Sequence, residues 1–365
     1  MPRLSPLIRT PARLFPRRAL FHSSPLRLAS AADSKPASVP IALISQIRAA
    51  RPGTPLSLAR TALQSTQNDL QQALAWIANQ AAESGAAKAK KLEGRTANEG
   101  LVGVAVLADG TGGVGVRAAM VELRCETDFV ARTDEFRDLV ESVARSVAFF
   151  AEPTPSSSST TNSLLLDRDL ASLGSTPVIP PPSASATHAE DTPTSTIASS
   201  IASTISRLGE NISLARVASV AIDPVLPGEQ PTHLAATYLH GAKASTSGDT
   251  SFQAGTLASL LVCRLGTGGS VEKDEVRKIV RALARQVVAM PTSTVEGGEE
   301  KVEEGEQSTA LYEQGLMTMS SSAAFEFEQG SKVGEVLRLW SKARGVEDGG
   351  LKVEQLKRWQ VGQEE

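Results

Sequence analysis

VELRCETDFVARTDEFRDLVESVARSVAFF, residues Val121–Phe150, carries a strand pattern followed by a helix pattern. Residues 120–125 alternate apolar and polar side chains, which predicts a half-buried strand. From Phe136 onward the apolar residues recur at helical spacing, which predicts an amphipathic helix after the strand. The connection between them places an acid beside a large aromatic, Asp128 and Phe129, where binding residues are often displayed. On the residues alone two interpretations stand: a binding site, or a Phe129 that caps the core beside a merely solvated Asp128.

The run Cys-Glu-Thr-Asp-Phe-Val-Ala at Cys125–Ala131, set between a strand and an aromatic-containing helix, closely resembles the signature of the elongation factor Ts family. Members of that family are guanine-nucleotide exchange factors for the GTPase elongation factor Tu. The resemblance implies that Asp128 and Phe129 project into the nucleotide domain of the GTPase. There the aromatic ring wedges beside helices near the nucleotide and disturbs the magnesium ion. It further places Thr127 and Val130 on the surface that binds elongation factor Tu, with Thr127 also shaping the connection.

Other segments fit the same family pattern. They are the basic linker ending in Glu99-Gly100, Leu208–Ile212, Tyr238–His240, Lys332–Leu337 and Arg358–Gln363. In the family the His of Tyr-x-His belongs to the partner-contacting surface, so the resemblance adds His240 to the binding residues. The resemblance covers about residues 41–150, 205–290 and 310–364.

Residues 41–85 contain three short helical patterns separated by Pro52-Gly53 and Asn68-Asp69. Either Asn68 or Asp69 can cap the third helix. Three helices in so short a segment predict a compact bundle, which resembles both the amino-terminal domain of the family and ubiquitin-associated (UBA) domains. Considered alone, this UBA-like bundle leaves a second function open: a ubiquitin-binding or scaffold protein that acts through the bundle.

Strands followed by a helix occur twice along the rest of the chain. The strand patterns lie at 103–108 and 114–125, and then at 214–222, 234–240 and 257–265, with helices at 136–150 and about 271–290. This order predicts an α+β fold with two related halves, each a small antiparallel sheet with packed helices. The expected boundaries are 86–151 for the first core half, 197–295 for the second, and 309–365 for its C-terminal segment.

Two low-complexity segments interrupt this pattern. Residues 152–196 are rich in Ser, Thr, Pro and Ala, and residues 296–308 are rich in Glu. Because a segment such as 152–196 buries too little apolar surface to offset the entropy of ordering it, we expect a disordered insert there. We expect the Glu-rich segment to be a solvated acidic linker.

The first 40 residues have the composition of a leader. Residues 1–32 contain six Arg and no Asp or Glu, which is typical of a mitochondrial transit peptide and predicts a matrix protein. The alternative is a basic arm that binds nucleic acid. Removing the six Arg leaves a chain more acidic than the net charge of −3 of the whole, which argues against a direct nucleic-acid partner.

The sequence offers few signs of covalent chemistry. No apolar run is long enough to cross a membrane. Cys125 and Cys263 sit in apolar strand patterns, and the four His residues have no metal-binding companions, so we expect no metal and no cofactor. Gly110, Gly112 and Gly115 form a GxGxxG, but a strand pattern follows where a dinucleotide site needs a helix. We therefore expect no catalytic residues and no nucleotide bound by this chain itself.

Overall fold

The computed structural model describes most of the chain between residues 39 and 363. The described residues are 39–51, 53–92, 94–153, 163–182, 195–225, 232–241, 251–269, 271–297, 308–319 and 325–363. Nearly all of the expected leader at 1–40 and most of the expected acidic linker at 296–308 lie outside them.

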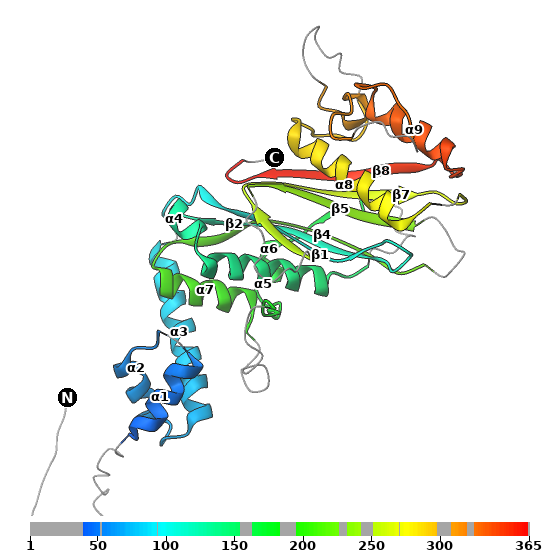
Figure 1. Cartoon of the computed structure of the whole chain (residues 1–365). Helices are drawn as coiled ribbons and strands as arrows, with labels where there is room; N and C mark the ends of the chain where they lie inside the picture. Colours follow the sequence, from blue (N-terminus) through cyan, green and yellow to red (C-terminus); the bar gives the residue numbers. More distant parts are fainter. Residues whose placement is uncertain are drawn as a thin grey trace, which may run out of the picture.

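An N-terminal bundle stands apart from the rest of the described chain (Figure 1). It consists of α1 (Ile41–Ala50), α2 (Leu56–Ser65) and α3 (Leu70–Leu92), which close around Ile47 and Leu63. Of the two candidate caps for the third helix, Asp69 is the one used, because its Oδ1 accepts the backbone N–H of Gln72 at 2.9 Å. The three predicted helices are confirmed, and α3 is longer than expected because it continues into the basic linker as far as Leu92.

The main body has four layers, in the order helices, sheet, sheet, helices (Figure 1). The first sheet runs β3-β4-β2-β1-β6. Its strands are β1 (Glu99–Asp109), β2 (Val116–Cys125), β3 (Leu166–Asp167), β4 (Ile212–Ile222) and β6 (Phe252–Gly255). The second sheet runs β5-β7-β8, with β5 (Thr232–His240), β7 (Leu257–Leu265) and β8 (Leu351–Gln360). All the strand pairs are antiparallel.

Helices cover the outer face of each sheet. On the first sheet lie α5 (Asp134–Phe150) and α7 (Ile197–Leu208), and on the second lie α8 (Lys273–Ala289) and α9 (Val333–Ala343). The remaining short elements are α4 (Asp128–Ala131), α6 (Leu170–Leu173) and the 3-10 turn η2 (Leu311–Glu313). Among the described helices, none is both long and apolar enough to span a membrane.

Both faces of the first sheet are buried, which explains the long apolar runs in its strands. Along β1, Val102 and Val104 pack against the second sheet, whereas Ala105 packs with α5. The ring of Phe136 fills the layer under α5 and is fully buried. Thr133 starts α5, because its Oγ1 accepts the backbone N–H of Phe136 at 3.2 Å. The opening stretch therefore forms the strand and helix that its pattern predicts.

The two sheets are not built from consecutive parts of the chain, which differs from the predicted boundary between the two core halves. β4 pairs with β2 over ten positions, and β6 pairs with β1, so strands from the expected second half complete the first sheet. The apolar pattern of β4 suits either sheet, and only its partner strand decides between them. The predicted α+β class with small antiparallel sheets is confirmed, while the expected boundary at 197 does not separate the two sheets.

The expectation that 152–196 is a disordered insert does not hold for residues 163–182. Leu165 is buried between the two sheets, and β3 pairs with the edge of β4. The backbone N–H groups of Leu164 and Leu165 donate to Gln355 Oε1 at 2.8 and 2.6 Å. The leucines at 164–166 and 170 fall in β3, in the bend before it and in α6. A few well-placed apolar side chains thus anchor a segment whose average composition is polar.

The glycine-rich joint between β1 and β2 is a hairpin turn. Gly110 has φ +81°, and a Cβ added there would lie 1.9 Å from the backbone oxygen of His233. Only glycine fits this left-handed position against a neighbouring strand. The prediction that this GxGxxG is a turn and not a dinucleotide site agrees with the strand that follows it.

Candidate partner-binding surface

The connection after β2 forms the four-residue helix α4. Thr127 precedes it in an extended conformation, with φ −127° and ψ 152°, and its Oγ1 accepts the backbone N–H of Val130 at 3.4 Å. The Sγ of Cys125 donates to the backbone oxygen of Thr127 at 3.2 Å. Both contacts hold the chain as it leaves the sheet, so the direction of the next side chains is fixed by the backbone.

Glu210 holds this connection from the other side. Its carboxylate accepts the backbone N–H of Thr127 at 3.1 Å and the Oγ1 hydroxyl of Thr127 at 2.6 Å. The adjacent Glu126 accepts the backbone N–H of Asn211 at 2.8 Å and pairs with Arg95 at 3.4 Å. The turn at 209–211 and the connection at 125–128 are therefore joined by reciprocal hydrogen bonds to carboxylates, which are stronger than those between neutral groups.

Phe129 points away from the protein. Its side chain is 81% exposed, while the next two residues, Val130 and Ala131, are each 8% exposed. An isolated apolar side chain on a surface is ordinary, but a phenyl ring held outward by a capped and clamped turn is a defined feature. The interpretation in which Phe129 caps the core is wrong, because the side chain is exposed.

Asp128 lies beside Phe129 and is half exposed. Its Oδ2 pairs with Arg132 Nη2 at 2.9 Å across one turn of α4. This pair lies in solvent, so it orients the carboxylate and adds little to stability. The acid and the ring together form a small surface with an apolar centre and a charged rim.

Thr127 and Val130 face inward. Thr127 is occupied by Glu210, and Val130 packs into the core beneath α5. Burial leaves Val130 little surface to offer a partner, so its expected contact role does not fit the structure. The buried position of Val130 suits a role in supporting the turn that carries Phe129.

His240 is exposed at the C-terminal end of β5. It pairs in register with Leu257, which pairs in turn with Gln360 at the end of β8. Just beyond, the backbone N–H of Gly362 donates to Glu122 of β2 at 3.0 Å. Since Glu122 lies three residues before Cys125, the end of the second sheet that carries His240 lies over the same end of the first sheet as α4.

Glu122 is fully buried between the sheets. It pairs with Arg124 at 2.7 Å and with the Nε of Arg216 at 2.7 Å, and Arg216 also stacks over the Trp359 ring at 4.7 Å. A buried carboxylate is stable only when its charge is paired in this way. Nothing in the sequence pattern distinguishes Glu122, because it is one polar position in an alternating strand.

The thiol of Cys125 is not reactive in this position. Burial, followed by the charge of Glu210, raises the pKa of Cys125 to about 12. A thiol with so high a pKa carries almost no thiolate at neutral pH and is a poor nucleophile. Cys125 is buried at the end of β2, in agreement with its place in an apolar strand pattern.

Sequence reasoning missed Glu210 as a positioning residue. It lies in Leu208–Ile212, a segment noted only for its resemblance to a family motif. The sign of Glu210 in the sequence is the polar motif before the strand pattern at 214–222. Its partner, Thr127, lies 83 residues away in the sequence. Of the other predicted residues, Phe129 and His240 are exposed and Asp128 is half exposed, all at the same end of the two sheets.

Comparisons with known proteins extend over the whole of this region. A family model described as Elongation factor TS matches residues 126–314. A protein of Coprinopsis cinerea named "Elongation factor Ts, mitochondrial" is 34% identical over 348 residues, covering 93% of this chain and 95% of its own length. A protein of the same name from Laccaria bicolor is 33% identical over 356 residues, covering 95% of this chain and 97% of its own length.

A third relative, from Malassezia globosa, carries the same name and is 30% identical, covering 88% of each chain. The names of these relatives agree with the elongation-factor hypothesis and with the mitochondrial localisation expected from the leader. None of the three names describes a ubiquitin-binding protein.

Proposed function

Because this chain belongs to the elongation factor Ts family, we propose that its nucleotide-exchange role in mitochondrial translation elongation depends on insertion of Phe129 into elongation factor Tu. The chain accelerates release of GDP from that GTPase and performs no covalent chemistry of its own. The observation that carries the proposal is the 81% exposure of Phe129 on a turn whose other apolar residues are buried.

Nucleotide exchange depends on the coupling between binding of the factor and binding of GDP to the GTPase. A factor that binds the empty GTPase more tightly than the GDP form weakens GDP binding by the same ratio. Shifting the GTPase from a ratio of 1:99 to 99:1 between its empty and GDP-bound states needs about 5.5 kcal/mol of differential binding. A contact that moves nucleotide-holding groups supplies such a difference, whereas a contact equal in both states supplies none.

A phenyl ring suits this role. Buried aromatic anchors are among the side chains that carry most of the energy of a protein interface. A divalent ion beside a diphosphate is the largest local charge, so its displacement weakens nucleotide binding strongly. Phe129 acts as the wedge, and Asp128 at its side contacts polar groups of the GTPase.

Preorganisation lowers the cost of binding. Ordering a mobile loop at an interface costs roughly 0.5–1.5 kcal/mol for each immobilised side chain. Here the hydrogen bonds of Thr127 with Glu210 and with Val130 already fix the turn in the free protein. Phe129 is therefore presented before the GTPase arrives.

Two other parts of the chain have roles in this proposal. His240, exposed at the same end of the molecule as α4, adds a second contact to elongation factor Tu. The bundle of α1, α2 and α3 takes the UBA-like fold of the family's amino-terminal domain and docks on the same GTPase. Its long helix α3 packs against α7, which connects it to the body that carries α4.

One assay tests the proposal as a whole. Purified mitochondrial elongation factor Tu is loaded with a fluorescent GDP analogue, and release is followed with and without this chain lacking its first 32 residues. We expect catalytic amounts of the chain to accelerate release at least tenfold. Unchanged release at equimolar chain contradicts the proposal.

A further inference from the structure

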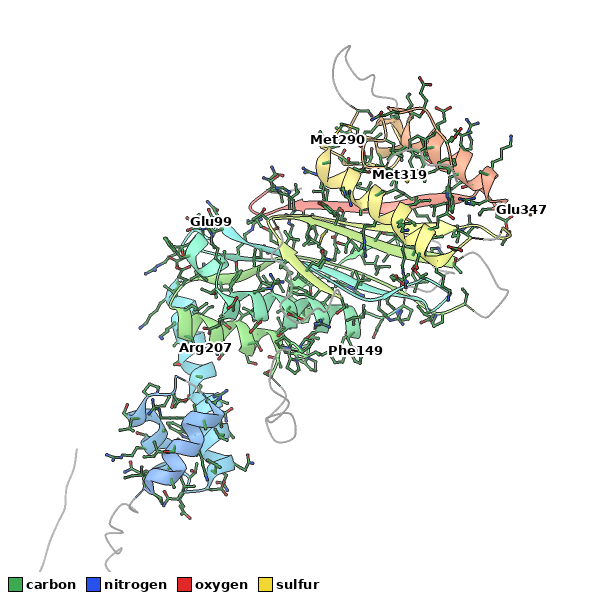
Figure 2. All side chains as sticks on the ribbon, in the orientation of Figure 1. Glu99, Phe149, Arg207, Met290, Met319 and Glu347 are labelled. Atoms are coloured by element: carbon green, nitrogen blue, oxygen red, sulfur yellow. The ribbon has the colours of Figure 1, made fainter. Side chains whose placement is uncertain are left out.

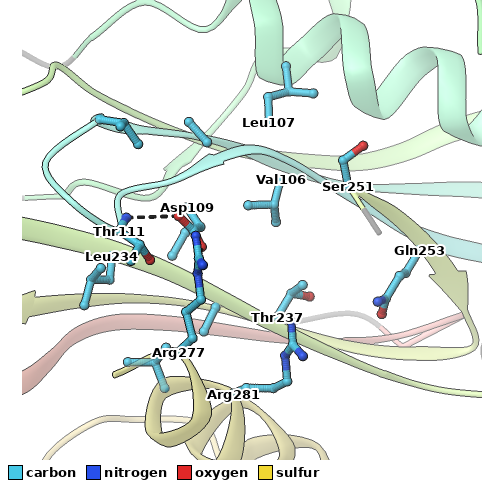
Figure 3. Close-up of a pocket in the computed structure, with 15 residues that line it drawn as sticks. Val106, Leu107, Asp109, Thr111, Leu234, Thr237, Ser251, Gln253, Arg277 and Arg281 are labelled. Carbon is cyan, nitrogen blue, oxygen red and sulfur yellow. Dashed lines mark hydrogen bonds and ion pairs between the residues drawn. The ribbon is translucent and has the colours of Figure 1, made fainter. Parts of the chain in front are cut away.

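An open cavity of 580 Å³ lies between the edges of the two sheets (Figure 3). It is lined by four consecutive residues of β1, Val106–Asp109, and by four consecutive residues of β5, Leu234–Thr237. A cavity beside the face of a strand touches alternate residues, since successive side chains point to opposite faces. Consecutive lining residues mean that the cavity borders the edges of both strands.

Among the described residues, the outer edge of β5 has no neighbouring strand, and the edge of β1 has none beyond Val106. β5 is the terminal strand of the second sheet and pairs only with β7. β1 pairs with β6 through Val102–Ala105, and the last backbone bond of that kind runs from Val106 to Ser251 at 2.7 Å. Unpaired strand edges present rows of backbone donors and acceptors to an incoming chain.

The third wall of the cavity is the basic side of α8. Arg277 and Arg281, one turn apart, both extend from the helix into the cavity, and Gln253 faces them from β6 (Figure 3). Arg277 is paired with Asp109 at 2.8 Å. Within the part of the chain that the structure describes, Arg281 has no recorded hydrogen bond or ion pair. Among the described residues the cavity thus holds a guanidinium, that of Arg281, with no carboxylate partner, beside the outer edge of β5.

The rim adds exposed apolar groups. Leu107 is 37% exposed and Val114 is 56% exposed, and both line the cavity. Among its described lining residues there is no aromatic side chain on which a nucleic-acid base could stack. The site combines the outer edge of a strand, an apolar rim and a cation that has no partner among the described residues. These features together recognise an extended peptide whose side chains alternate between apolar and acidic.

We propose that this cavity is a docking site for an extended acidic segment of another protein, which adds as a strand to the free edge of β5. Main-chain hydrogen bonds to β5 supply the affinity. Arg281 selects a carboxylate side chain and Val114 contacts an apolar one. The site is separate from Phe129 and does not rest on the exchange function.

The test uses the full chain and fluorescein-labelled nine-residue peptides of alternating Val and Glu, measured by fluorescence anisotropy. Two comparison peptides replace Glu by Gln or by Lys. Two more carry N-methyl groups on alternate backbone nitrogens, one set on the Val positions and the other on the Glu positions. Strand addition uses the N–H groups of one set only, so one N-methylated peptide keeps its binding and the other loses it.

The side-chain part of the site is tested with Arg281→Gln. The matched control is Lys278→Gln, an exposed cation on the same helix that does not line the cavity. We expect saturable binding of the Val/Glu peptide, a loss of affinity of about tenfold in Arg281→Gln, and no change in Lys278→Gln. Circular dichroism of both variants establishes that they are folded.

Several results overturn the proposal. They are the absence of saturable binding, equal binding to Arg281→Gln and wild type, equal binding of the Lys peptide, and equal binding of both N-methylated peptides. Tighter binding of single-stranded oligouridylate than of the Val/Glu peptide assigns the basic side of α8 to nucleic acid and also overturns it.

Discussion

The Glu210 carboxylate accepts two hydrogen bonds from Thr127, one from the backbone N–H at 3.1 Å and one from Oγ1 at 2.6 Å. These bonds join the turn before β4 to the start of α4. The geometry makes the direction of Phe129 a property of two distant segments and not of its own short helix. The free energy that orients the wedge therefore resides largely outside α4.

Replacing Glu210 by Ala tests this relationship. The change leaves the Thr127 N–H without its acceptor, and hydrogen bonds to charged groups contribute about 1.5–3 kcal/mol. We expect the free energy of unfolding to fall by about that amount and stimulated GDP release to slow several-fold, since the wedge is no longer fixed. Denaturant unfolding and release rates on the same preparations measure both.

The control for that experiment is Glu335→Ala, which removes an exposed Glu of α9 with no recorded bond in the described chain. It should change neither quantity. A Glu210→Ala protein with wild-type stability and wild-type exchange would show that the clamp is unimportant.

Gly85 sets how closely the bundle approaches the body. A Cβ at this position would lie 2.0 Å from the backbone oxygen of Ala202 in α7, a contact that no side chain can make. Gly85→Leu should therefore separate α3 from α7 at a cost of about 1–3 kcal/mol, even though leucine is the better helix former. Hydrogen exchange should show loss of protection in α7. The comparison variant Gly94→Ala, where a Cβ meets nothing within 4 Å, should leave protection unchanged.

Local patterns predicted most of the elements, whereas long-range pairing remained out of reach. The helix after Phe136 and the hairpin at Gly110 follow from spacing and turn chemistry, which act over a few residues. The placement of β4 in the first sheet and the carboxylate of Glu210 against Thr127 depend on neighbours far away in sequence. No periodicity in a single chain encodes which edge a strand joins.

The segment around Leu165 shows the limit of composition as a guide. Average polarity predicted disorder for 152–196, yet one buried leucine and two backbone bonds to Gln355 fix residues 163–182. The entropy argument applies to a segment as a whole and misses a short anchor within it.

Leu165→Ala measures the strength of that anchor. Removing a buried leucine side chain from between two sheets should lower the free energy of unfolding by about 2–5 kcal/mol. Leu170→Ala, at a leucine that is 37% exposed in the same segment, should cost much less. Equal, small losses in the two variants would mean that the segment contributes little to the core.

The lowered pKa of Glu275 should make the stability of the protein depend on pH. Burial alone would raise the pKa of Glu275, but hydrogen bonds from Arg344 and from Trp340 Nε1 lower it below its ordinary value of 4.5. A carboxylate with a lowered folded pKa stabilises the protein above the unfolded value and loses that contribution as pH falls through the folded value. The stability difference between wild type and Glu275→Gln should therefore be constant above pH 4.5 and shrink below it.

Denaturant unfolding between pH 3 and pH 7 measures that difference, with Glu335→Gln as the exposed control. A difference that does not change across this range would contradict the assignment of the ion pair with Arg344.

The effect of Phe129→Ala on stimulated GDP release decides whether the exposed ring drives nucleotide exchange. Because the ring is 81% exposed, its removal should leave the melting temperature unchanged, while release from mitochondrial elongation factor Tu slows tenfold or more, about 1.4 kcal/mol of barrier. Phe149→Ala is the matched control: this ring is 61% exposed at the other end of α5 (Figure 2) and should alter neither value. A folded Phe129→Ala protein that stimulates release as fast as wild type would contradict the account.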